Sequence, residues 1–232
     1  MANAIYNRVL NTLSSRTLKK IGRQLEPVDL PLRKVLHDTD EPVDYVYFPT
    51  DGIVSMVNEP VPGEVVEIAT IGNEGAVGLP VLLGANSMPS RSIVQVAGKG
   101  MRWRTAAFRK FVDSDDKFRD LLLRYTLALV NQIAQSASCN RLHEVHQRCA
   151  RWLLQTQDRM ASDTFALTHE FLAQMLGVHR PTVSVAAGML QQNGLIDYSR
   201  GKITVLDRKA LEKASCPCYR LISREYERLL GD

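Results

Sequence analysis

The sequence predicts an α+β fold: an N-terminal antiparallel β-roll or jelly-roll-like barrel, a long dimerisation helix and a C-terminal winged helix-turn-helix. Eight of the ten prolines lie between residues 27 and 89, and eight of the fourteen glycines lie between 52 and 100. Neither occurs from residue 101 to 176. Because these residues favour turns, the first part must turn often and the middle can be helical. Two short apolar-periodic segments and a hairpin pattern then occupy residues 167–206.

The length of 232 residues, with 45% hydrophobic and 23% charged residues, is sufficient for two cores. We expect the β-roll at residues 1–112, the dimerisation helix at 113–140 and the winged helix-turn-helix at 141–232. No apolar run is long enough to span a membrane, and the first twenty residues contain basic side chains without a clear cleavage site. We therefore expect a cytoplasmic protein without a membrane partner.

Cysteine content and charge add two further constraints. Four cysteines are too few for a disulfide scaffold, which fits a reducing compartment. The formal net charge is +4, and residues 141–232 hold 13 Lys and Arg against 10 Asp and Glu. The basic excess therefore lies in the predicted helix-turn-helix part, although it is modest support for nucleic-acid binding.

The expected elements of the first part are a helical lead-in and several short strands rich in β-branched and aromatic residues. Turn residues bound these strands, and their close spacing indicates an antiparallel sandwich or barrel. In order, the expected elements are a helix at Asn7–Ile21 and strands at Val28–Val35, Tyr45–Phe48, Ile53–Val57, Val65–Ile71 and Ser92–Ala97.

A long helix follows, capped by Asp113 or Ser114 and running to about Ser138. Its apolar residues repeat at alternating spacings of four and three, which is the pattern of a coiled-coil seam. This seam predicts a dimer interface formed by Phe118, Leu122, Tyr125, Leu129, Gln132 and Ile133. The alternative is a helix packed on its own barrel. Further helices are expected at Arg141–Met160, Arg208–Ala214 and Tyr219–Leu230.

The strongest local pattern is a pair of short helices joined by a glycine turn. Thr168 can cap the first helix, and Gly177 ends it. The second begins at His179 with Arg180 and Pro181, because proline is tolerated in a first helical turn. A helix pair of this kind presents its second helix to the major groove of DNA.

A β-hairpin wing follows the second helix, which stops at Asn193 and Gly194. Arg200 and Lys202 at its tip suit contact with phosphates. Simple packing of the helices is the alternative, and the presence of the wing favours DNA binding over it. The predicted DNA-binding residues are Thr168, His179, Arg180, Thr182, Ser184, Val185, Gln191, Arg200 and Lys202.

The run from Leu176 to Ser184, reading Leu-Gly-Val-His-Arg-Pro-Thr-Val-Ser, is followed by Met189-Leu190 and Gly194-Leu195-Ile196. This run, together with the order of a β-rich part, a long helix and a winged helix-turn-helix, resembles the Crp/Fnr family of bacterial transcription regulators. The resemblance implies a homodimer that binds pseudo-palindromic double-stranded DNA, with RNA polymerase as a further candidate partner. It also implies an N-terminal sensor domain that modulates DNA binding.

The same resemblance assigns base reading to Arg180. Family members commonly have Glu after this Arg, whereas this chain has Pro181, and Val185 stands where some members have a second arginine. Proline cannot accept a hydrogen bond from a cytosine amino group. We therefore expect a target site that differs from the best-known family sites.

The resemblance also implies a diverged ligand pocket in the sensor domain. Cyclic-nucleotide-binding relatives have a Gly-Glu pair and an Arg-Ser pair; here Leu79 follows Gly78, while Arg91 and Ser92 match the phosphate-binding half. Gly78, Arg91 and Ser92 are thus candidate ligand residues, and an ordinary strand pair with a solvated guanidinium is the preferred alternative. No cofactor is expected; a cyclic nucleotide or a haem near His37 stays an alternative.

Two other patterns bear on metal or catalytic chemistry. His143-Glu144-Val145-His146 is one residue short of the spacing of a zinc protease, and Cys216-Pro217-Cys218 is a single cysteine pair where structural zinc sites usually need two. We expect neither a metal site nor enzyme activity, and we interpret the cysteine pair as a terminal turn with a redox alternative. A protein-binding scaffold is the other non-enzymatic alternative.

Overall fold

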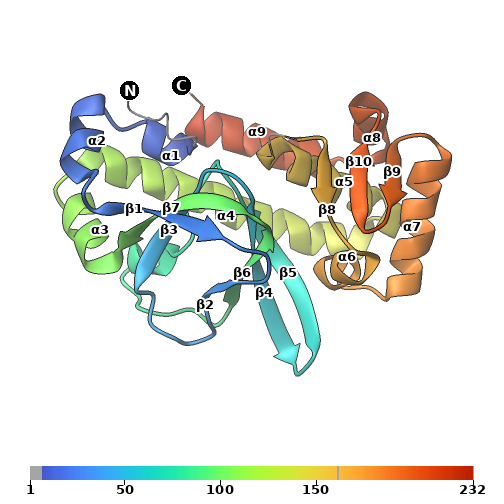
Figure 1. The fold of residues 1–232 in the computed structure, drawn as a ribbon, viewed down its shortest axis with the longest axis horizontal. Helices are drawn as coiled ribbons and strands as arrows, with labels where there is room; N and C mark the ends of the chain where they lie inside the picture. The colour runs from blue at the N-terminus through green and yellow to red at the C-terminus, as the bar shows by residue number, and fades with distance from the viewer. Residues whose placement is uncertain (1–6, 161, 232) are drawn as a thin grey trace. The chain divides into compact units, whose positions relative to one another are not determined.

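The computed structural model describes residues 7–160 and 162–231, which form two compact units (Figure 1). Among the described residues, the first unit holds 7–56 and 70–127, and the second holds 57–69, 128–160 and 162–231. A search of the described helices finds none that combines the length and apolar character needed to cross a membrane.

The β-rich part contains two antiparallel sheets, which agrees with the predicted fold class. One sheet has the order β1-β7-β3 and the other β2-β6-β4-β5. The strands are β1 (Leu25–Leu30), β2 (Val35–His37), β3 (Tyr45–Pro49), β4 (Ile53–Val61), β5 (Glu64–Ile71), β6 (Arg91–Val96) and β7 (Gly98–Arg104).

The expected single strand at Val28–Val35 is wrong, because the chain turns between β1 and β2. Arg33 has a φ of 66° in this turn, a value that a strand does not adopt. Strand β7 was missed, since its two glycines indicated a turn. A Cβ at Gly98 would lie 2.3 Å from the carbonyl oxygen of Asp51, so glycine is required here by close backbone approach.

Helices cover the β-rich unit at several points. They are α1 (Arg8–Asn11), α2 (Ser15–Ile21), the 3₁₀ turn η1 (Leu79–Val81), α3 (Thr105–Val112) and the first part of α4 (Asp116–Leu142). Trp103, Phe108 and Phe118 are buried, and the ring centroids of Trp103 and Phe108 lie 5.7 Å apart. Asp113, predicted as a cap of the long helix, is instead the C-cap of α3. The carboxylate of Asp115 accepts from the Phe118 amide at 3.0 Å at the start of α4.

The predicted dimer seam on α4 faces the interior of the single chain. Phe118, Leu122, Tyr125, Leu129 and Gln132 are at most 5% exposed, and Ile133 is half-buried. The five buried side chains are unavailable to a second copy, so their assignment to the interface is wrong, whereas that of Ile133 stays a prediction. The same 4-3 spacing serves packing within one chain, which was the alternative interpretation.

A different apolar series on α4 is exposed. Leu123, Leu127 and Val130 are 44%, 46% and 52% exposed, and they repeat at spacings of four and three along the helix. Positions at these spacings lie on one helix face.

The second unit holds the remaining elements. They are α5 (Val145–Arg159), β8 (Thr164–Ala166), α6 (His169–Leu176), α7 (Arg180–Gln192), β9 (Ile196–Ser199), β10 (Lys202–Val205), α8 (Arg208–Ala214) and α9 (Cys218–Leu230). The predicted helix at Arg141–Met160 begins later, because Glu144 forms a capping box with Gln147 at the start of α5.

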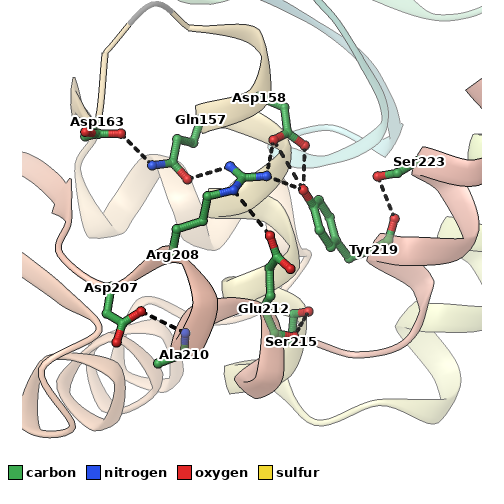
Figure 2. A network of polar contacts seen from close by, with 10 residues as sticks. All are labelled: Gln157, Asp158, Asp163, Asp207, Arg208, Ala210, Glu212, Ser215, Tyr219 and Ser223. Carbon is green, nitrogen blue, oxygen red and sulfur yellow. Dashed lines mark hydrogen bonds and ion pairs between the residues drawn. The ribbon is translucent and has the colours of Figure 1, made fainter. Parts of the chain in front are cut away.

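A polar network joins α5 to the two C-terminal helices (Figure 2). The Arg208 guanidinium donates to Asp158 at 2.6 Å and to the Tyr219 hydroxyl at 2.6 Å, and lies 3.2 Å from Glu212. Burial and the Asp158 carboxylate raise the pKa of Tyr219 to about 12. The network therefore fixes α8 and α9 on the helix that also supports the helix-turn-helix.

Candidate nucleic-acid interface

The helix pair forms as the sequence predicts. The Thr168 hydroxyl accepts from the Phe171 amide at 3.2 Å, and Gly177 ends α6 with a left-handed φ of 61°. His179 precedes α7 as its cap residue, and Pro181 lies in the first turn. The inner face of α7 is buried and consists of Val183, Ala186, Ala187 and Leu190.

The outer face of α7 is exposed to solvent. Arg180, Thr182 and Ser184 are exposed, and Val185 is 66% exposed. Within residues 7–160 and 162–231, Arg180 makes no ion pair with a carboxylate. Its charge is therefore available to an external anion or base.

The predicted wing is the hairpin of β9 and β10, which lies beside α7 in Figure 1. Ser199 pairs with Lys202, so only Arg200 and Gly201 form the loop, with φ values of 51° and 74°. Positive φ at both central residues is the geometry of a tight hairpin turn. Arg200 and Lys202 are exposed, and neither is paired with a carboxylate of the described chain.

Two of the predicted contact residues also hold the module together. Gln191 accepts from the Tyr198 amide of the wing at 3.0 Å, and the Ser184 hydroxyl lies 3.0 Å from Nδ1 of His169. The His169 ring stacks on Tyr198 with centroids 4.1 Å apart. Sequence reasoning missed His169, because a histidine directly after a cap residue has no pattern that indicates such stacking.

The environment of His169 favours the neutral form of its imidazole. Partial burial, with a smaller effect of the Arg180 charge, lowers the pKa of His169. A neutral ring stacks on Tyr198 without placing a further positive charge beside Arg180.

Among the candidate ligand residues of the β-rich unit, Arg91 already pairs with an anionic side chain. Arg91 donates to the Asp38 carboxylate at 2.8 Å, while Ser92 on the same strand is buried. A Cβ at Gly78 would lie 3.0 Å from Cε1 of His37, and the φ of Gly78 is 106°. A phosphate approaching Arg91 would therefore meet the negative charge of Asp38.

We expect no saturable binding of cAMP or cGMP at micromolar concentration. Leu79 cannot accept from a ribose hydroxyl, and an unmatched buried hydroxyl costs about 1–3 kcal/mol. The measurement is isothermal titration calorimetry on the full chain, with the Asp38→Asn variant as comparison. A saturable micromolar isotherm for the native protein would show that Arg91 releases Asp38 to hold the cyclic phosphate.

The structure also joins two sequence patterns that are far apart along the chain. Cys139 and His143 at the end of α4 lie next to Cys216 and Cys218, with all four ligand atoms within 4.8 Å of one another. No local pattern indicates this cluster, because its halves are separated by more than 70 residues.

Comparison with known proteins supports this description. The Crp-like helix-turn-helix domain matches residues 147–214. No curated protein gives a significant sequence match. Among solved structures, FixK2 from Bradyrhizobium japonicum has a TM-score of 0.71 at 18% identity, covering 83% of this chain and 98% of its own.

Two other solved structures share the same architecture. A CRP-family transcriptional regulator from Thermus thermophilus has a TM-score of 0.68 at 18% identity, covering 81% of this chain and 96% of its own. The c-di-GMP responsive regulator CLP from Xanthomonas campestris has a TM-score of 0.65 at 15% identity, covering 84% and 100%.

The fold and the interface define a protein class in which a β-roll and a long helix precede a winged helix-turn-helix. More particularly, residues 147–214 form a Crp-like helix-turn-helix domain, and the chain has the fold of the Crp/Fnr transcription regulators.

Proposed function

We propose that the protein is a sequence-specific, homodimeric transcription regulator that binds a pseudo-palindromic DNA site. The observation that carries this proposal is the outer face of α7. Its Arg180 and the two cations of the wing on the same module form no ion pair with any residue that the structure describes. A protruding helix with a polar face fits the major groove, and tip cations fit the flanking phosphates. Catalysis is not part of the proposal.

The proposed contacts divide into two kinds. Arg180 donates to O6 and N7 of a guanine, and Val185 contacts a thymine methyl, so these residues read bases, with Ser184 and Gln191 as polar additions. Pro181 offers no acceptor to a cytosine. The residues proposed to position the DNA backbone are Thr168, His179, Thr182, Arg200 and Lys202.

Removal of either wing cation should weaken binding to every DNA sequence by a similar factor. Each phosphate contact that is lost should make the negative slope of log K against log salt shallower by about 0.9. Fluorescence anisotropy of Arg200→Ala and Lys202→Ala on a selected and a scrambled duplex, over a series of salt concentrations, measures this slope.

The matched control for the wing is Lys110→Ala, because Lys110 is an exposed lysine on α3 outside the interface. Its slope should equal that of the native protein. Native slopes in both wing variants would contradict the phosphate role, and a salt-insensitive association with a protein partner would support the scaffold alternative instead.

The dimer is proposed to form through the exposed face of α4. Leu123, Leu127 and Val130 give each helix an apolar stripe that a second copy can cover. Two-fold pairing of these helices would present two copies of α7 to half-sites about one helical turn apart.

The β4–β5 hairpin is a continuous segment of chain through which the β-rich unit could modulate DNA binding. Its strands begin and end in the first unit, whereas residues 57–69 belong to the second. Within the second unit, the Trp152 indole donates to Glu67 at 3.1 Å. We propose that a change in the β-rich unit reaches α5 through this hairpin.

A further inference from the structure

Four potential metal ligands converge in the second unit. Cys139 lies in the last turn of α4 and His143 directly follows this helix, while Cys216 precedes Pro217 and Cys218 is the first residue of α9. Sγ of Cys139 lies 3.4 Å from Sγ of Cys216, and Sγ of Cys218 lies 3.5 Å from Nδ1 of His143. The three cysteines are at most 1% exposed.

These separations suit a single tetrahedral ion. With metal–sulfur bonds of about 2.3 Å and metal–nitrogen bonds of about 2.0 Å, the ligand atoms of a tetrahedron lie roughly 3.5–3.8 Å apart. All four ligand atoms are within 4.8 Å of one another, so small side-chain rotations complete the geometry. A simple disulfide of Cys139 and Cys216 would leave His143 and Cys218 without a function.

Buried positive charge surrounds the cluster. Arg148 and Arg151 of α5 are 5% and 6% exposed, and neither forms an ion pair with a carboxylate in the described parts of the chain. Nε of each is buried without a hydrogen-bond partner there. Buried guanidinium groups need an anion nearby. The Cys139 thiol interacts electrostatically with both arginines, and the Cys216 thiol interacts with Arg148.

Metal binding would give the cluster a negative charge beside these arginines. Three thiolates and a neutral imidazole around a divalent ion carry a net charge of −1. An adjacent guanidinium compensates this charge, which makes the buried site electrostatically consistent.

Neighbouring groups hold the ligands in place. The Gln135 amide donates to Sγ of Cys218 at 3.1 Å, a hydrogen bond of the kind that orients metal-binding thiolates. The network of Figure 2 fixes the cysteine turn on both sides, through Glu212 before it and Tyr219 after it. The ligands are therefore presented by an already constrained scaffold.

We propose that Cys139, His143, Cys216 and Cys218 form a structural Cys₃His site for a divalent, thiolate-preferring metal ion, with Zn²⁺ as the expected occupant. Residues 145–214, which include both helices of the helix-turn-helix and the wing, lie between the two halves of the site. Binding therefore closes a loop around the DNA-binding module and stabilises the second unit.

Metal content and cobalt spectroscopy of the native full chain test the site directly. We expect one equivalent of zinc per chain by elemental analysis after purification under reducing conditions. Reconstitution of the chelator-treated protein with Co²⁺ should produce the intense visible bands of a tetrahedral site and a thiolate-to-cobalt charge-transfer band. These readouts do not depend on DNA binding, so failure of the proposed function would leave them unchanged.

Variants with matched controls locate the ligands. Cys216→Ser, Cys218→Ser and His143→Asn should each lower the zinc content and alter the cobalt spectrum. Cys149→Ser is the thiol control, because Cys149 is fully buried outside the cluster, and His146→Asn is the imidazole control. Both controls should keep one equivalent of zinc.

Alkylation of the cysteines in the native chain tests the site without any substitution, so it remains informative if a variant does not fold. Chelation should expose three cysteines to alkylation, and added zinc should protect them again. Native protein without bound zinc and without a tetrahedral cobalt spectrum would overturn the proposal. So would a Cys139–Cys216 disulfide that forms reversibly with no metal effect, since that result would identify a redox pair.

Discussion

Replacement of Arg180 by alanine should abolish sequence selectivity while general DNA binding remains. A bidentate contact with guanine contributes about 1–3 kcal/mol of discrimination, which corresponds to a roughly 5- to 150-fold loss in the specific-to-random affinity ratio. The guanidinium is exposed and unpaired in the described chain, so its removal leaves no buried charge behind. Competition gel shifts with the selected site and with scrambled duplexes measure the ratio.

The control for this experiment is Arg220→Ala. Arg220 is an exposed arginine on α9, outside the candidate interface, and its loss removes the same charge. This variant should keep the selectivity of the native protein. An unchanged affinity ratio in Arg180→Ala would contradict the assignment of base reading to this residue, whatever happens to the total affinity.

Aspartate at Leu123 and Leu127 should separate the dimer into folded monomers. Four carboxylates would then face one another across the proposed two-fold seam, where burial of unpaired charge is strongly unfavourable. Because both side chains are nearly half exposed in the single chain, the fold of each monomer should persist. Analytical ultracentrifugation measures the mass, and circular dichroism checks the fold.

DNA binding should fall with the loss of the dimer. A monomer engages one half-site only, and removal of the linked second contact costs roughly 10²- to 10⁴-fold in affinity. Leu83→Asp is the control, because Leu83 is 61% exposed in the β-rich unit and lies outside α4. A double variant that stays dimeric would show that the interface lies elsewhere.

The helix-turn-helix and its wing were predictable because their signals are local. The cap at Thr168, the glycine at the end of α6 and the Arg200-Gly201 loop are each determined by a few neighbouring residues. The fold class was predictable from a similar signal, the distribution of glycine and proline along the chain. These predictions required no knowledge of long-range contacts.

The prediction of the dimer interface was wrong because the periodicity of apolar residues on α4 does not distinguish a face that packs within the chain from one that packs against a second copy. The 4-3 repeat of Phe118, Leu122 and Tyr125 is identical for a dimer seam and for packing on the same chain. The repeat at Leu123 and Leu127 has the same form, so only the folded structure separates the two faces.

The metal-ligand cluster was not predictable for a related reason. A histidine on one helix and a cysteine pair in a distant turn each have an ordinary local explanation. The tertiary fold brings Cys139 within 3.4 Å of Cys216, across 77 residues of sequence. Spacing rules for zinc sites describe ligands that are close in sequence, and this arrangement falls outside them.

Selection of DNA sites from a random duplex library by the purified full chain tests the central claim most directly. We predict enrichment of an inverted repeat whose half-sites lie about one helical turn apart, with a guanine in each half that Arg180→Ala no longer enriches. A library that shows no enrichment, or an enriched sequence without two-fold symmetry, would contradict the account.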